Sequence, residues 1–320
     1  MADIIGLVLP FFGLILLGYV AAKITRQPEE ALGWLNTFII YVSLPALFFK
    51  LVAKTPIAQL TRVDFILANV SATYLVFGLI FAAGLVLRRA SVGEATVQGL
   101  AAAYGNIGYM GPGLALLAFG EPAAVPVALV FCFENMLHFM VAPALMSVSG
   151  GEKRPAATIV PDVARRIATH PFILATAAGF AAAFLSFEVP APLQRLIDYL
   201  AQAAAPCALF AMGVTLALRP LKRVPAEIVY IVPAKLLLLP VTMYLMLGLA
   251  GNFDPVWVHT AVLLAALPTA TNVFVIGQQY GVWQERASAT ILITTVLSVA
   301  TVTLLLYLVK SGLLAGDPFP

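Results

Sequence analysis

The stretch "YGNIGYMGPG", residues 104–113, lies inside a segment that is apolar enough to cross a bilayer. It contains four glycines, an asparagine and a proline, which all disfavour the interior of a helix. In hydrocarbon, a helix is stable because it pairs its own backbone N–H and C=O groups, and a break leaves some of them without partners. The stretch therefore predicts a helix that is interrupted at membrane depth, where something else must satisfy the freed groups.

The composition identifies the class of protein. Of the 320 residues, 62% are hydrophobic and only 10% are charged, whereas soluble domains have about 45–50% apolar and about 25% charged residues. An integral membrane protein is therefore expected. The two cysteines form no disulfide or metal-binding pattern. Because the basic residues occupy short loops, membrane topology explains the net charge of +3 better than nucleic-acid binding does.

About 20 apolar residues are needed for each membrane span, and the chain divides into ten such segments. The predicted all-α fold has spans at 4–22, 32–53, 65–87, 96–119, 123–147, 168–187, 196–218, 225–249, 256–280 and 286–309.

Loop charges predict the orientation of these spans. With the N-terminus outside, twelve basic residues fall in inner loops and five in outer ones, so the positive-inside rule places both termini on the non-cytoplasmic side of the inner membrane. The inner residues are Lys23, Arg26, Arg88, Arg89, Lys153, Arg154, Arg165, Arg166, Arg219, Lys222, Arg223 and Arg286. The outer residues are Lys50, Lys54, Arg62, Arg195 and Lys310.

The two halves of the sequence align without gaps at an offset of 161 residues, which superposes the ten spans as five on five. Since five is odd, the second half must be inserted upside down, as in the inverted repeats of transporters. The predicted organisation is a first repeat at 1–148, a cytoplasmic linker at 149–167, a second repeat at 168–310 and a short tail at 311–320.

A second interruption falls in the ninth span, in "LPTATNVFVIG" at residues 267–277. Each interruption alone could be an ordinary proline kink with glycine for close packing. Paired interruptions in the two halves favour a binding site instead. Two half-helix N-termini, with the amides of Asn106 and Asn272, would suit an anion such as a carboxylate. The freed carbonyls could hold a cation instead.

Three segments extend this interpretation: "GNIGYMGPGLALLAFG" (105–120), "LPTATNVFVIGQQYG" (267–281) and "APCALFAMGVTLAL" (205–218). They resemble the auxin efflux carrier family, which includes plant PIN proteins and bacterial malonate- or malate-type permeases. The resemblance implies a bile-acid-symporter/antiporter-like fold with crossing helices 4 and 9. It further implies a scaffold of helices 1, 2, 6 and 7, a transport domain that moves as an elevator, and a homodimer.

Asn106, Pro112, Pro268 and Asn272 match the crossover positions of that family. The long cytoplasmic loop of the plant members is absent, so regulation through it is not expected. The full set of predicted substrate-binding residues is Asn106, Gly108, Tyr109, Gly111, Pro112, Pro268, Thr269 and Asn272 from the interruptions, with Ser43 and Phe210 from the scaffold.

Three ionisable residues lie well away from the ends of their predicted spans: Glu134 and His138 in "FCFENMLHFM" and Lys235 in "IVPAKLLLLP". Such groups are costly in a membrane and mark either a pathway or a pair. One interpretation is a structural ion pair between Glu134 and Lys235. The other makes Lys235 a fixed positive charge that replaces the cation of sodium-coupled relatives, while Glu134 or His138 titrates. Proton and sodium coupling both stay open, and no cofactor or metal is expected.

The predicted function is secondary transport of a small organic anion across the inner membrane. An enzyme is disfavoured because the sequence lacks HExxH, GxSxG and phosphate-binding motifs. A sensor or lipid-binding protein on a transporter fold, without flux, is the main alternative, and a channel fits an inverted-repeat site less well. Substrate identity, coupling and direction are open at this stage.

Overall fold

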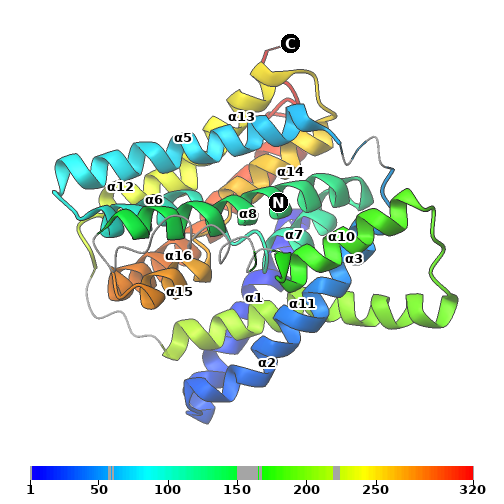
Figure 1. Ribbon diagram of the computed structural model, residues 1–320, viewed down its shortest axis with the longest axis horizontal. Helices are drawn as coiled ribbons and strands as arrows, with labels where there is room; N and C mark the ends of the chain where they lie inside the picture. Colours follow the sequence, from blue (N-terminus) through cyan, green and yellow to red (C-terminus); the bar gives the residue numbers. More distant parts are fainter. Residues whose placement is uncertain are drawn as a thin grey trace. The chain divides into compact units, whose positions relative to one another are not determined.

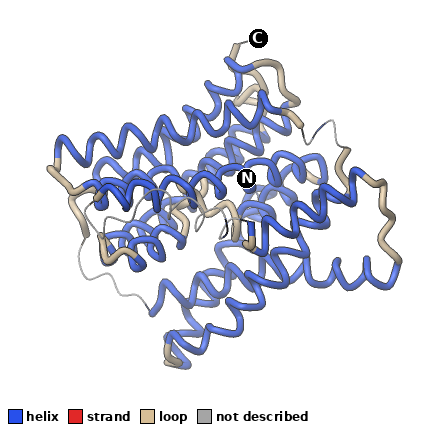
Figure 2. Tube along the Cα trace, in the orientation of Figure 1, coloured by secondary structure: helices blue, strands red, loops and turns tan. Residues whose placement is uncertain are grey.

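The computed structural model describes residues 2–56, 59, 61–149, 165, 168–218 and 224–319. Within these residues the chain is helical, with loops between the helices and no β-strand (Figure 2). The predicted all-α class is therefore confirmed for the described chain. The predicted linker at 149–167 falls mostly outside the described residues, as do Arg219, Lys222 and Arg223.

Seven helical segments in the described part of the chain are long and apolar enough to cross a membrane. They are Val8–Thr25, Glu30–Ala53, Val63–Leu87, Glu121–Val148, Ala191–Leu218, Ile228–Ala250 and Gln284–Lys310. Two shorter apolar helices are Pro171–Phe184 and Pro255–Ala266. The chain is thus a multi-pass membrane protein.

The described helices form two compact units, each made of segments that are distant in the sequence. The first unit comprises residues 1–63, 108–132 and 168–220. Its elements, of which Figure 1 labels the α-helices, are α1 (Ala2–Thr25), η1 (Glu29–Leu32), α2 (Gly33–Phe38), η2 (Ile39–Ser43), α3 (Leu44–Ala53), α7 (Gly111–Phe119), η3 (Glu121–Ala123), the start of α8 (Ala124–Val148), α10 (Pro171–Phe184) and α11 (Ala191–Leu218).

Glycines determine the packing of α1 against α11 in this first unit. A Cβ atom at Gly18 would overlap the carbonyl oxygen of Phe210, and one at Gly213 would overlap that of Ile15. Small residues at helix crossings allow such close backbone approach in membranes, where packing rather than the hydrophobic effect holds helices together.

The second unit comprises residues 64–107, 133–167 and 221–320. Its elements are α5 (Val63–Leu87), α6 (Val92–Ala103), the end of α8, α12 (Ile228–Pro233), η4 (Ala234–Leu238), α13 (Leu239–Ala250), α14 (Pro255–Ala266), α15 (Thr271–Gln279) and α16 (Gln284–Lys310).

The two helices that end at the interruptions, α6 and α14, begin with strong caps. Ser91 and Glu94 form a capping box at the start of α6, and the Asp254 carboxylate accepts the Val256 N–H at 2.8 Å at the start of α14. Both helices then run only twelve residues. The fourth and ninth predicted spans are therefore each divided in two, at 104–110 and at 267–270.

Two turns of π-helix occur in longer helical segments, at Ile39–Ser43 and at Ala234–Leu238. Each ends two residues before a proline, Pro45 or Pro240. The proline ring would clash with the carbonyl four residues earlier, and a wider turn relieves that clash. Ser43 and Lys235, both predicted functional residues, lie in these turns and are fully buried.

We expect Gly213→Ala to destabilise the protein, because the added methyl group would push α1 away from α11. Overpacking of this kind costs about 1–3 kcal/mol. Thermal unfolding of the purified protein, followed by size-exclusion chromatography after heating, measures the effect. Gly13→Ala on α1 is the matched control, since nothing lies within 4 Å of its Cβ position. Equal melting temperatures for the two variants would contradict the packing argument.

Candidate functional site

The two interrupted segments of the second unit pair with each other. Gly105 and Thr269 form an isolated antiparallel β-bridge. Two backbone hydrogen bonds accompany it: Asn106 N–H donates to Pro268 O at 2.8 Å, and Ala270 N–H donates to Tyr104 O at 2.9 Å. Each break therefore supplies backbone partners for the other, which is the internal satisfaction that a membrane interior demands.

The breaks start where the sequence makes helix unfavourable. Tyr104, the C-cap of α6, has extended dihedral angles, and so does Leu267, the C-cap of α14. Leu267 precedes Pro268, and a residue before proline is disfavoured in the helical region. The chain becomes helical again at Gly111, where α7 begins, and at Thr271, where α15 begins.

Side chains donate hydrogen bonds to backbone carbonyl groups that lose their helical partners at the breaks. The Thr269 hydroxyl donates to Ala101 O at the end of α6 at 2.7 Å. The Thr269 N–H, which would reach Ala265 O in an unbroken helix, donates instead to the Thr294 hydroxyl at 3.1 Å. Ala265 O accepts the Lys235 ammonium at 2.6 Å. A lysine thus caps the C-terminal end of α14, where the helix dipole favours a positive charge.

Lys235 is fully buried, at 0% exposure, in the π-helical turn of Ala234–Leu238. Its ammonium also lies close to Gly105, because a Cβ at that position would be 3.3 Å from Lys235 Nζ and 3.1 Å from Leu264 O. Only a residue without a side chain leaves this approach undisturbed. Gly105 therefore allows the Lys235 ammonium to lie close to the Gly105–Thr269 bridge.

A relay of polar side chains connects the start of α15 to α8. Asn272 Nδ2 donates to the Tyr104 hydroxyl at 2.6 Å, and that hydroxyl donates to Asn135 Oδ1. The Tyr104 ring stacks on His138, with centroids 4.2 Å apart. Asn272 is only half-buried, in the first turn of α15, whereas Tyr104 is 1% exposed. The relay therefore fixes the orientation of a half-buried amide in the first turn of a helix.

The other buried ionisable residues have different partners. The Thr73 hydroxyl donates to Glu134 Oε1 at 2.7 Å. His138 Nδ1 lies 3.2 Å from the Tyr74 hydroxyl, and its buried Nε2 has no hydrogen-bond partner among the described residues. Glu134 and Lys235 form no direct ion pair among the described residues. Each group has a neutral hydrogen-bond partner instead, the Thr73 hydroxyl for Glu134 and Ala265 O for Lys235.

The structure thus gathers Asn106, Pro268, Thr269, Asn272, Glu134, His138 and Lys235 in the second unit. Asn106 and Asn272 are not equivalent, because Asn106 directly follows the bridge and is 3% exposed, while Asn272 begins a helix. The remaining predicted residues belong to the first unit: Gly108, Tyr109, Gly111, Pro112, Ser43 and Phe210.

Sequence reasoning did not single out Tyr104, Asn135, Thr73 or Thr294. Tyr104 stands at the head of the opening stretch, and Asn135 directly follows Glu134. Their polarity within apolar spans was the available signal. Among the described residues, no group of three His, Cys, Asp or Glu side chains is arranged to hold a metal ion.

Comparison with known proteins gives matches along the whole chain. The family model described as "Membrane transport protein" matches residues 3–133 and 138–307. A Rhizobium meliloti protein named "Putative malonate transporter" is 74% identical over 320 residues, covering 100% of both chains. "Uncharacterized transporter YfdV" of Escherichia coli K12 is 24% identical over 311 residues, covering 95% of this chain and 96% of its own. An "Uncharacterized transporter" of Methanothermobacter thermautotrophicus is 25% identical over 304 residues, covering 93% and 95%.

We expect Thr269→Val to lower the melting temperature, because it leaves Ala101 O without its hydroxyl donor at membrane depth. Leaving a buried acceptor unsatisfied costs about 1–3 kcal/mol. Thr271→Val, two residues away, is the matched control, since the Thr271 hydroxyl makes no hydrogen bond within the described structure. Equal melting temperatures for the two variants would mean that the hydrogen bond from Thr269 to Ala101 O does not stabilise the protein.

Proposed function

The chain belongs to the membrane transport protein family, and from that premise we propose that it is a secondary transporter of a small organic anion. Family membership confirms the resemblance to the auxin efflux carriers and makes the chain a transporter rather than an enzyme. The name of the Rhizobium meliloti relative suggests a malonate-like dicarboxylate as the substrate.

One observation carries this proposal: an accessible amide and a buried ammonium flank the paired breaks. Asn272 presents its amide in the first turn of α15, where the helix N-terminus carries about half a positive charge. Lys235 binds the end of α14, and its ammonium lies close to Gly105 of the Gly105–Thr269 bridge. Amide donors, a helix N-terminus and an ammonium together favour a carboxylate over a cation or a neutral solute.

The wider architecture follows as part of the same proposal. The ten predicted spans would form two inverted repeats, at 1–148 and 168–310, joined by the linker at 149–167 and followed by the tail at 311–320. Both termini would lie outside the inner membrane. An elevator-type movement of a transport domain against a homodimeric scaffold would then expose the substrate to each side in turn.

Coupling would depend on the charges around Lys235. Two other ionisable groups are buried in the same unit: Glu134, which accepts from Thr73, and His138, which contacts Tyr74 and Tyr104. With Glu134 protonated, the Lys235 charge is unopposed and an anion binds more tightly. With Glu134 ionised, the two charges cancel. Proton and anion binding would therefore be thermodynamically linked, each favouring the other.

The alternative is a sensor or lipid-binding protein that binds the anion without moving it. Flux separates the two functions: counterflow of labelled malonate into proteoliposomes supports transport, whereas binding with no flux supports the sensor.

We expect malonate to raise the melting temperature of the purified protein, and Asn272→Ala to weaken that stabilisation at least about tenfold in malonate concentration, equal to about 1.4 kcal/mol. Asn106→Ala, at a buried position, is expected to weaken it less. Asn36→Ala on α2 is the control and should leave the response unchanged. If malonate still stabilised both the Asn272→Ala and the Asn106→Ala variant to the same extent, the binding site would not lie at the paired breaks.

We expect Lys235→Ala to reduce malonate uptake and to alter its dependence on pH and sodium, because the fixed charge at the end of α14 is lost. Lys23→Ala is a matched control, since Lys23 also donates to a helix carbonyl, Ala217 O, at 2.9 Å. Lys235→Gln, which keeps a donor for Ala265 O, separates loss of charge from loss of folding. Unchanged uptake with an unchanged pH and sodium profile in both Lys235 variants would refute the role.

A further inference from the structure

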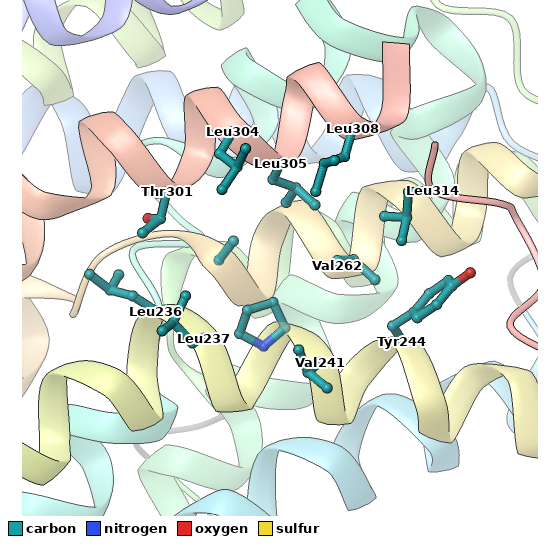
Figure 3. A pocket seen from close by; sticks show the side chains of 12 residues that line it. Leu236, Leu237, Val241, Tyr244, Val262, Thr301, Leu304, Leu305, Leu308 and Leu314 are labelled. Carbon is teal, nitrogen blue, oxygen red and sulfur yellow. The ribbon is translucent and has the colours of Figure 1, made fainter. Parts of the chain in front are cut away.

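An apolar groove of about 200 Å³ runs between α13, α14 and α16 in the second unit. Figure 3 shows Leu304, Leu305 and Leu308 of α16 on one side, with Leu237 and Val241 on the other. None of the residues assigned to the substrate, Asn272 included, lines this groove.

The groove has a buried floor and exposed walls. Leu236, Val262 and Ala266 form the floor and are at most 4% exposed. On the walls, Val241 is 54% exposed and Leu304 is 55% exposed. A groove of this form admits a narrow apolar chain from the side, with its end against the floor.

The chemistry of the lining excludes water and polar solutes. Ten of the twelve lining residues shown in Figure 3 carry wholly apolar side chains. The hydroxyl of Tyr244 is bound to Ala315 O at 2.9 Å, and the buried Thr301 hydroxyl has no partner within the described chain. Apolar cavities take up hydrocarbon in preference to polar solutes, so the lining of this groove favours an apolar occupant.

The surroundings identify that occupant. The walls continue into the exposed apolar faces of α13 and α16, which include Leu245, Leu297 and Val296. In a multi-pass membrane protein such faces adjoin the bilayer, whose interior consists of acyl chains. We propose that the groove holds one acyl chain of a bilayer phospholipid.

Such a chain would pack directly against the Lys235 contact. Leu236 and Leu237 follow Lys235 in the π-helical turn, and Ala266 follows Ala265, whose carbonyl accepts the ammonium. The bound acyl chain therefore supports both sides of that hydrogen bond. This proposal does not depend on which solute the protein carries, or on whether it carries one.

The test uses the full-length protein in liposomes that contain phosphatidylglycerol with a diazirine near the end of one acyl chain. After illumination, mass spectrometry of peptides locates the crosslinks. We expect several-fold more label on the groove residues of α13 and α16 than at Val229, which is 79% exposed on α12 but outside the groove. Val241→Trp, which fills the groove, should reduce the label on Leu304 and Leu308 several-fold.

Val229→Trp is the matched control and should leave the groove label unchanged. Leu304→Trp fills the groove from the opposite wall and replaces Val241→Trp if that variant does not fold. Equal labelling at Val229 and in the groove, or labelling that both filling variants leave intact, would show only the surrounding bilayer lipid and overturn the proposal. Protein–protein crosslinks from the groove in place of lipid label would assign it to a second copy of the chain and overturn it as well.

Discussion

The rest of the second unit depends on one constraint: two interrupted helices must satisfy their backbone groups where water is absent. They do so by pairing with each other through the Gly105–Thr269 bridge. Backbone pairing at that depth determines what surrounds it, because the carbonyls released by α6 and α14 then need donors. Thr269 supplies one and Lys235 the other. A side chain at position 105 would separate Lys235 from the bridge, so glycine, threonine and lysine form one arrangement.

The sequence predicts the interruptions because their cause is local. Glycine, proline and the residue before proline disfavour helix wherever they stand, so 104–113 and 267–277 could be identified without a structure. The partners of those breaks could not be identified in the same way. Thr269 and Ala101 are 168 residues apart, and nothing in helical periodicity distinguishes their contact from many others. For the same reason, depth along a span suggested a Glu134–Lys235 pair, whereas the actual partners are Thr73 and Ala265.

The compact units of the structure do not follow the order of the sequence. The offset of 161 residues divides the chain into consecutive segments, while each compact unit combines helices from the early and the late parts of the chain. Residues such as Gly18 and Gly213 show why periodicity does not reveal this. Each leaves room for the backbone of a residue nearly 200 positions away. Gly13, on α1 with Gly18, has no such neighbour. Composition alone does not tell these glycines apart.

The position of Lys235 bears on the coupling that we propose. A freed helix carbonyl at membrane depth can be satisfied by a bound metal cation or by a fixed ammonium. A cation can dissociate, so its charge can follow the transport cycle, whereas the lysine stays attached to α12–α13 through the chain. Its charge is therefore constant unless a proton leaves. The variable charge nearby is Glu134, held by the neutral Thr73 hydroxyl rather than by Lys235 itself. In the transport that we propose, a constant cation beside a carboxylate that changes protonation would couple the anion to a proton rather than to sodium.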